Sequence, residues 1–312
     1  MGAGQSSGLA ARLADRRRPL RLYSITPPRE STSAEDLERI GQVTIERLRP
    51  LDLDALILYD IEDEGDRNHD DRPFPYLATV DPGTFRADHL TGWDRPVIVY
   101  RSVGKYEPAT LKQWMTEQDP AEVATVLVGA SSRDKPVRTR LDEALSLWRD
   151  AGSVLPMGGV TIPERHATRL DEHDRMLRKQ ESGCSFFVTQ VIYDLTAAKD
   201  LVSDYAYTCR DRGIEPAPLV FTLSVCGSLK TLEFLQWLGV HVPRWLQNQL
   251  VYSEDPLAES YEQCTEMARE LAAFCRCLDV PFGFNVESVS IRRVEIEASV
   301  RLAAYIGELL AE

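Results

Sequence analysis

The 312-residue chain lacks the features that define several large classes of protein. No apolar run reaches the roughly 18 residues that a membrane span requires. Neither G-x-G-x-x-G nor G-x-x-x-x-G-K-[ST] occurs, so both common phosphate loops are missing. Only six of the 36 basic residues are lysines, and 49 acidic residues give a net charge of −13. A surface this acidic repels phosphate backbones, so we expect no nucleic acid and no membrane among the partners.

Metal-binding and secretory patterns are also missing. The six cysteines are scattered without a C-x-x-C, and no histidine pair has ligand spacing. We therefore expect no metal and reduced, mostly buried thiols in a cytoplasmic protein. The small, polar and basic start of the chain has no apolar segment of a secretory signal. We expect residues 1–19 to be a flexible N-terminal arm and residues 20–312 to be one domain, and the oligomeric state stays open.

What the sequence does contain is a repeated pattern of short apolar runs followed by longer amphipathic stretches. The apolar runs cover residues 20–25, 55–59, 96–100, 125–128, 155–162, 185–191, 218–222 and 282–286. Uniformly apolar strands separated by helices indicate a parallel sheet that is buried on both faces. Eight such units predict an α/β fold, a single (β/α)8 TIM barrel. A doubly wound open sheet is the alternative, although it would normally carry a glycine-rich phosphate loop.

The functional site of such a barrel lies at the carboxyl ends of its strands, so polar residues there are the candidates. Gln190 is the most conspicuous, because an apolar strand runs directly into an uncharged amide that can both donate and accept hydrogen bonds. The other candidates follow the first, second, third, fifth, sixth and eighth runs: Arg29; Tyr59, Asp60 and Glu62; Tyr100 and Arg101; Glu164 and His166; Thr189 and Tyr193; Asn285 and Glu287.

Four stretches resemble the methylenetetrahydrofolate reductase family, in the right order over about residues 20 to 290. Pro27-Pro28-Arg29 resembles the family's F-E-F-F-P-P-R, and Pro163-Glu164-Arg165-His166 resembles its Y-P-E-x-H. The stretch from Gly183 to Asp194, with Thr189-Gln190 and Tyr193, resembles A-G-A-x-x-x-I-T-Q-x-x-x-D, and Val242-Pro243-Arg244-Trp245 resembles I-P-x-W. The resemblance implies a (β/α)8 barrel that reduces 5,10-methylenetetrahydrofolate to 5-methyltetrahydrofolate in one-carbon metabolism and methionine biosynthesis.

The resemblance also assigns roles to individual residues. In the family, hydride passes from NAD(P)H to bound FAD and then to the folate, and Gln190 matches the glutamine that contacts both ring systems. Tyr59 and Tyr100 are candidates for stacking, and Asn285 for a hydrogen bond to pterin or nicotinamide. Arg29 and Arg101 are candidates for binding a pyrophosphate or the glutamate tail of folate.

Several positions depart from the family pattern. The family's acidic residue before P-P-R aligns with Ser24, and its R-G-D aligns with Gly129-Ala130-Ser131. Its strand-three histidine aligns with Val97, its flavin-contacting tyrosine with Ile162, and a lysine with Leu177. Together these changes remove charge and hydrogen-bonding groups from the flavin position, so FAD is doubtful. We expect NADH or NADPH to pass hydride directly to the folate, with the choice between them open.

Opening the folate ring still requires a proton donor, which a serine at position 24 cannot supply at neutral pH. Asp60, Glu62 and Glu287 are the candidate acids, because burial at a barrel mouth raises the pKa of a carboxyl group. Two other functions stay open: a conventional FAD-dependent reductase of the same family, and a folate-binding barrel without turnover.

Overall fold

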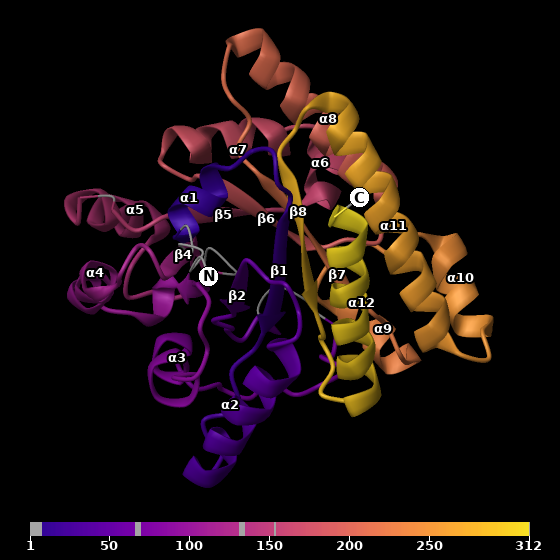
Figure 1. The fold of residues 1–312 in the computed structure, drawn as a ribbon, viewed down its shortest axis with the longest axis horizontal. Coiled ribbons are helices and arrows are strands. Elements are labelled where there is room, and N and C mark those ends of the chain that lie inside the picture. The colour runs from indigo at the N-terminus through magenta and orange to yellow at the C-terminus, as the bar shows by residue number, and fades with distance from the viewer. Residues whose placement is uncertain (1–7, 66–69, 131–134, 153, 312) are drawn as a thin grey trace, which may run out of the picture.

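Eight parallel strands form a closed barrel in the order in which they occur along the chain (Figure 1). This computed structural model describes residues 8–65, 70–130, 135–152 and 154–311. The strands are β1 (Leu20–Ile25), β2 (Ala55–Leu58), β3 (Val97–Ser102), β4 (Val123–Val128), β5 (Met157–Thr161), β6 (Phe186–Val191), β7 (Leu219–Ser224) and β8 (Phe282–Glu287). The predicted (β/α)8 barrel is therefore confirmed, and the open-sheet alternative is excluded because β8 pairs with β1.

Helices surround the barrel and connect successive strands. They are α1 (Leu9–Ala14), α2 (Ala34–Leu48), α3 (Pro82–His89), α4 (Pro108–Glu117), α5 (Leu141–Asp150), α6 (Pro163–Arg169), α7 (Glu172–Glu181), α8 (Leu195–Arg212), α9 (Leu229–Trp237), α10 (Arg244–Tyr252), α11 (Pro256–Leu278) and α12 (Arg293–Ala311). A short 3-10 helix, η2 (Val103–Lys105), follows β3. Ser33 caps α2, its side chain accepting a hydrogen bond from the Asp36 N–H.

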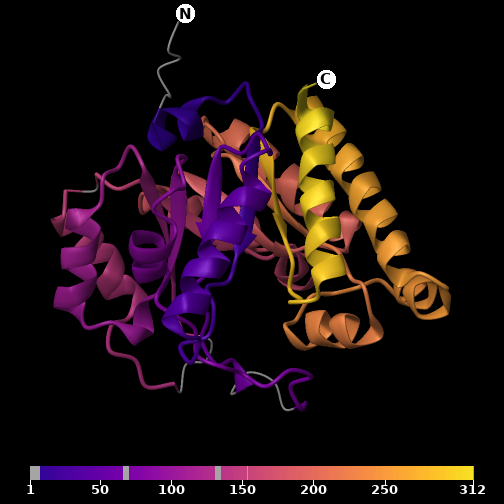
Figure 2. The same cartoon turned by 60° about the horizontal axis from the view of Figure 1, so that its bottom comes forward.

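The start of the chain forms a helix that packs against the barrel. Residues 9–14 form α1, and Leu9 and Leu13 are buried in the same apolar cluster as Leu20, Leu22 and other residues that fill the barrel. Arg12 of α1 also pairs with Asp54, just before β2, at 2.8 Å. Apolar side chains four residues apart place one face of this helix against the amino end of the barrel, opposite the segment between β2 and α3 (Figure 2). The ordering of α1 therefore follows from the apolar surface that it covers.

The buried apolar residues form two clusters, one inside the barrel and one between the strands and the helices. No helix among the described residues combines the length and the apolar character that crossing a bilayer requires. All six cysteines are free, and all but Cys277 are buried. The strand interiors alternate, so that residues such as Ile57, Ile98 and Val188 face the barrel axis and their neighbours face the helices.

Candidate functional site

Polar side chains replace the apolar barrel filling at the carboxyl ends of four adjacent strands. We call this group the polar layer: Ser24 of β1, Tyr59 after β2, Thr222 of β7, and Asn285 and Glu287 of β8. The Asn285 Nδ2 group donates to Ser24 Oγ at 3.0 Å, to the Tyr59 hydroxyl at 3.2 Å and to Thr222 Oγ1 at 3.3 Å. The Asn285 amide on β8 therefore links β1, β7 and the end of β2 at the level where the apolar filling of the barrel ends.

Glu287 completes the polar layer and receives its hydrogen bonds on one oxygen. Its Oε2 accepts from the Tyr59 hydroxyl at 2.6 Å and from Ser24 Oγ at 3.3 Å. Burial raises the pKa of Glu287 above its ordinary value, although the hydrogen bonds from Tyr59 and Ser24 oppose that shift. Burial, followed by the nearby charge of Glu287, also raises the pKa of Tyr59, which therefore stays a phenol that donates. The pair can hold and release a proton at the barrel mouth.

The polar layer can be approached from the carboxyl side of the barrel. Tyr59 and Glu287 are both half-buried, and so are Val128 and Val160 at the ends of β4 and β5. Deeper residues, such as Asn285 and Thr222, are fully buried. Tyr100 packs its ring edge-on against that of Tyr59, with the centroids 4.9 Å apart, and so fixes the tyrosine that contacts Glu287. The buried Asn285 Oδ1 has no hydrogen-bond partner among the described residues.

Gln190 lies on β6, the strand next to β7 of the polar layer. The register between β6 and β7 shifts between Val188 and Val191, which is where Gln190 stands. Its side chain is half-buried, and its Nε2 donates to the carbonyl of Leu238, just after α9, at 3.1 Å. Backbone from the segment after β7 therefore holds the nitrogen of the amide.

Glu164, at the start of α6, carries a strongly perturbed carboxyl group. Both of its carboxylate oxygens are buried without a hydrogen-bond partner among the described residues. Burial, with a smaller contribution from the Asp194 carboxylate, raises the pKa of Glu164 to about 7. Asp194 itself caps α8 and pairs with His241 at 2.9 Å. Glu164 therefore exchanges a proton near neutral pH at the carboxyl end of β5.

The other two candidate acids are held by cations instead. Asp60 is buried, and it accepts from the Ser102 N–H at 2.8 Å and pairs with Lys105 Nζ at 2.5 Å. The Tyr106 hydroxyl donates to it at 2.7 Å. Glu62 pairs with Lys135 at 3.0 Å. Asp60 and Glu62 therefore each have a cation as a partner, whereas Glu287 accepts hydrogen bonds from two hydroxyl groups.

The two candidate arginines do not join the polar layer. Strand alternation turns Tyr100 toward the barrel axis and Arg101 toward the helices, where Arg101 pairs with Asp81 at 2.5 Å. Its guanidinium also lies 3.9 Å from the ring centroid of Trp114 on α4. Arg29 is exposed on the loop after β1. Arg101 thus has a carboxylate and an aromatic ring as partners within the protein.

Three residues from the resembling motifs make internal contacts. Thr189 Oγ1 accepts from the Thr222 N–H at 2.9 Å, and the Tyr193 hydroxyl bonds to the Ser224 carbonyl and to Ser260. His166 is fully buried and pairs with Asp204 on α8 at 3.0 Å. Three possible metal-ligand atoms, one each from His166, His173 and Asp204, lie within 4.8 Å of one another. The Nε2 atom of His166 is held by the Asp204 carboxylate, its buried Nδ1 has no hydrogen-bond partner among the described residues, and we assign no ion to the group.

The sequence places Ser24 and Thr222 among the polar residues at strand ends, but it assigns neither of them a role in binding or catalysis. Their positions at the ends of β1 and β7 were the available signal, but hydroxyl groups are too common for that signal to stand out. Of the family positions, Val97 and Leu177 are packed in the apolar core and offer no polar group, while Ser131 lies outside the described residues.

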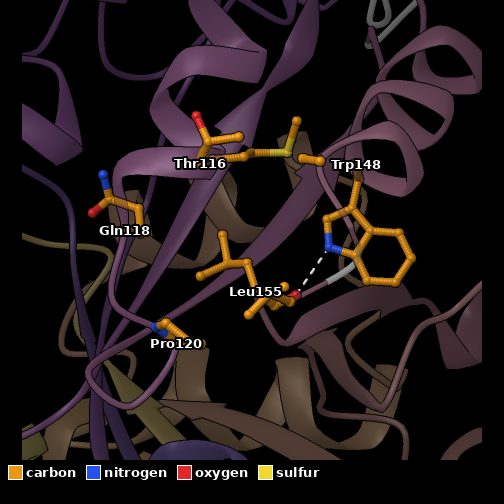
Figure 3. Close-up of a pocket in the computed structure, with 8 residues that line it drawn as sticks. Thr116, Gln118, Pro120, Trp148 and Leu155 are labelled. Atoms are coloured by element: carbon orange, nitrogen blue, oxygen red, sulfur yellow. Dashed lines mark hydrogen bonds between the residues drawn. The ribbon is translucent and has the colours of Figure 1, made fainter.

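A pocket elsewhere on the molecule does not contribute to this site. It lies between α4 and α5 and has a volume of about 280 Å³ (Figure 3). Met115, Trp148 and Leu155 line it, and the Trp148 Nε1 group donates to the Leu155 carbonyl at 2.9 Å. Leu155 precedes β5, so this pocket faces the amino ends of the strands, away from the polar layer.

Comparison with known proteins supplies one close relative. No protein-family profile and no curated protein sequence matches the chain. Among solved structures, an uncharacterized protein from Clostridium thermocellum that binds two copies of 5-methyl-5,6,7,8-tetrahydrofolic acid is 38% identical, with a TM-score of 0.85. The match covers 96% of this chain and 99% of that one. EDTA monooxygenase from Chelativorans sp. BNC1 matches over 95% and 94% of the two chains, but at 12% identity and a TM-score of 0.51 it shares the fold alone.

Proposed function

Because the chain belongs to the same protein family as the 5-methyltetrahydrofolate-binding protein from Clostridium thermocellum, we propose that it binds a reduced folate at the carboxyl end of its barrel. The observation that carries this proposal is the 38% identity to that protein over nearly the whole of both chains. The polar layer supplies suitable chemistry, because a pterin edge presents donors and acceptors side by side. A carboxyl group and two amides can match that edge, and Glu287, Asn285 and Gln190 provide them.

The reaction that we propose is the reduction of 5,10-methylenetetrahydrofolate to 5-methyltetrahydrofolate. A proton is transferred to N10, the bond from N10 to the methylene carbon breaks, and a cationic iminium forms at N5. Hydride from C4 of NADH or NADPH then adds to that carbon, which becomes the methyl group, while the nicotinamide is oxidised. One proton and one hydride are consumed, so the step balances without another reductant. The ligand of the Clostridium thermocellum protein is the product of this reaction.

Among the three candidate acids Asp60, Glu62 and Glu287, the last suits this step best. A general acid works when its pKa lies near the working pH, and burial moves the pKa of Glu287 in that direction. The Tyr59 hydroxyl at 2.6 Å donates to the carboxylate once the proton has left, so the ionised form is stabilised after transfer. Ser24 contributes a second hydrogen bond to the same oxygen. In this way the serine that replaces the family acid supports a carboxyl group on the neighbouring strand.

The positions that the resemblance aligns with the family's flavin contacts carry apolar side chains in this chain. Val97, Ile162 and Leu177 are apolar where the resembling family has a histidine, a tyrosine and a lysine. Val97 and Leu177 are also buried, so their side chains contribute packing and no hydrogen bond. We therefore propose direct hydride transfer, with nicotinamide and pterin stacked so that the reacting carbons are about 3 to 3.5 Å apart.

Steady-state kinetics on the purified protein test the proposal. We expect NADH or NADPH oxidation that depends on 5,10-methylenetetrahydrofolate, with double-reciprocal lines that intersect, because both substrates must be bound together. A stoichiometric yellow flavin and parallel lines would instead indicate the FAD-dependent reaction. Tight binding of 5-methyltetrahydrofolate without any turnover would leave a folate-binding barrel and would refute the reductase.

A further inference from the structure

A second group of side chains at the carboxyl end combines two cations with four aromatic rings. We call it the aromatic–cation cluster: Arg72, Phe74, Tyr76, Lys230, Phe234 and Trp237. The Arg72 guanidinium carbon lies 5.5, 5.4 and 5.0 Å from the ring centroids of Tyr76, Phe234 and Trp237. Phe74 meets Phe234 edge-on at 5.3 Å, and Lys230 Nζ lies 4.6 Å from the Phe74 ring centroid.

The cluster joins two parts of the barrel that are not adjacent. Residues 70–76 follow β2, whereas Phe234 and Trp237 belong to α9, which follows β7. In the barrel order, β8 and β1 lie between β7 and β2. The contact is fixed by the Trp237 Nε1 group, which donates to the Asp70 carbonyl at 2.9 Å. The segment between β2 and α3 therefore extends along the carboxyl side of the barrel toward α9, past the strands that carry Ser24 and Glu287 (Figure 2).

The two cations in the cluster lack anionic partners, in contrast to the others at this end of the barrel. Lys105, Lys135 and Arg101 pair with Asp60, Glu62 and Asp81. Within the described ranges neither Arg72 nor Lys230 forms an ion pair, and the buried Nε and Nη1 groups of Arg72 have no hydrogen-bond acceptor. A guanidinium with unmet N–H groups beside a second cation is suited to bind a carboxylate ligand.

We propose that the aromatic–cation cluster binds the p-aminobenzoylglutamate tail of the folate whose pterin occupies the polar layer, an inference that rests on the proposed function. The tail ends in two carboxylates, which match Arg72 and Lys230 in number and charge. Its benzoyl ring is flat and apolar, which suits Phe74, Phe234 and Trp237. The cluster is the part of the site that distinguishes a folate from a pterin without a tail.

A dinucleotide pyrophosphate is the other anion that the reaction involves. Pyrophosphate sites are usually built from a glycine-rich loop and free backbone N–H groups at a helix start. The sequence has neither common phosphate loop. At the start of α9 the Thr231 N–H already donates to Ser228 Oγ. The cluster offers side-chain cations and rings, which favours the carboxylates of the folate tail.

Binding measured with and without the tail tests this assignment. Titration calorimetry would compare 5-methyltetrahydrofolate with 5-methyltetrahydropteroate, which lacks the glutamate, on the wild type, Arg72→Gln and Lys230→Gln. We expect the wild type to bind the glutamate form about ten- to hundredfold more tightly, as charge-assisted hydrogen bonds allow. Arg72→Gln should remove most of that preference and leave the affinity for the pteroate form unchanged, and Lys230→Gln should remove part of it.

Arg39→Gln is the matched control, because Arg39 is an exposed residue of α2 whose loss changes the net charge equally. It should keep the full preference. Equal weakening of both ligands by Arg72→Gln would assign a structural role and overturn the inference, as would a raised KM for the dinucleotide with no change in folate binding. A wild type that binds both ligands equally overturns this inference alone. A wild type that binds neither ligand overturns the proposed function as well.

Discussion

Replacing Glu287 with glutamine tests the chemistry of the polar layer directly. The amide keeps the shape of the side chain and an oxygen that accepts from Tyr59 and Ser24, but it cannot supply an acidic proton. General acid catalysis typically contributes about 10²- to 10⁴-fold to a rate, so we expect kcat to fall by about 100-fold or more. The Tyr59 hydroxyl at 2.6 Å from the carboxylate should preserve the local hydrogen bonds in the variant.

The dependence of the rate on pH gives a sharper criterion than the size of the loss. The protonated carboxyl is the active form, so activity of the wild type should fall as pH rises through the raised pKa of Glu287. This alkaline decline should disappear in Glu287→Gln. The assay is folate-dependent NADH oxidation across the pH range, with 5-methyltetrahydrofolate affinity measured in parallel to confirm that the variant still binds.

A matched control comes from the carboxylate that pairs with Lys135. Glu62→Gln makes the same chemical change at the same end of the barrel, and its activity should stay within a factor of a few of the wild type, because Glu62 is held in an ion pair at 3.0 Å. If Glu62→Gln loses 100-fold while Glu287→Gln does not, the acid has been assigned to the wrong strand. If both variants retain full activity, neither carboxyl group supplies the proton.

Three further changes have defined outcomes. Gln190→Ala should raise KM for the folate or lower kcat, while its thermal stability changes little because one hydrogen bond to the Leu238 carbonyl is lost; unchanged kinetics would remove Gln190 from the site. Burial raises the pKa of Glu164 from an ordinary 4.5 to about 7, so the contribution of this residue to stability falls as pH rises between those values. The variant Glu164→Gln should therefore have an unfolding free energy about 1 to 3 kcal/mol higher than that of the wild type above pH 7. Equal stability of the two proteins at all pH values would refute the raised pKa. Leu9→Ala should cost about 2 to 5 kcal/mol in urea unfolding, because Leu9 is fully buried, whereas a negligible cost would mean that α1 does not pack on the barrel in solution.

The sequence was sufficient to predict the barrel because its strands are uniformly apolar and regularly spaced. The predicted run 20–25 coincides with β1, and the run 282–286 falls within β8. Helix α1 was missed because six residues give too short a pattern to be distinguished from a basic tail.

The site was harder to predict than the fold, because its contacts join residues far apart in the chain. Three strand-end carboxyl groups were equal candidates from the sequence, and only the approach of Tyr59 to Glu287, 228 positions away, separates them. The direction of the Arg101 side chain could have been predicted from the sequence. Its neighbour Tyr100 faces the barrel axis, so alternation along β3 turns Arg101 outward. The pairing of residues 70–76 with α9 has no local signal in the sequence.

Helix α1 covers the amino end of the barrel, so the folate and the dinucleotide must both bind through the carboxyl end. The reactant that binds first lies beneath the other. Turnover would then follow an ordered mechanism, in which the reactant that binds first is the last to dissociate. Product inhibition patterns would reveal that order, and they would identify the reactant that rests against Glu287.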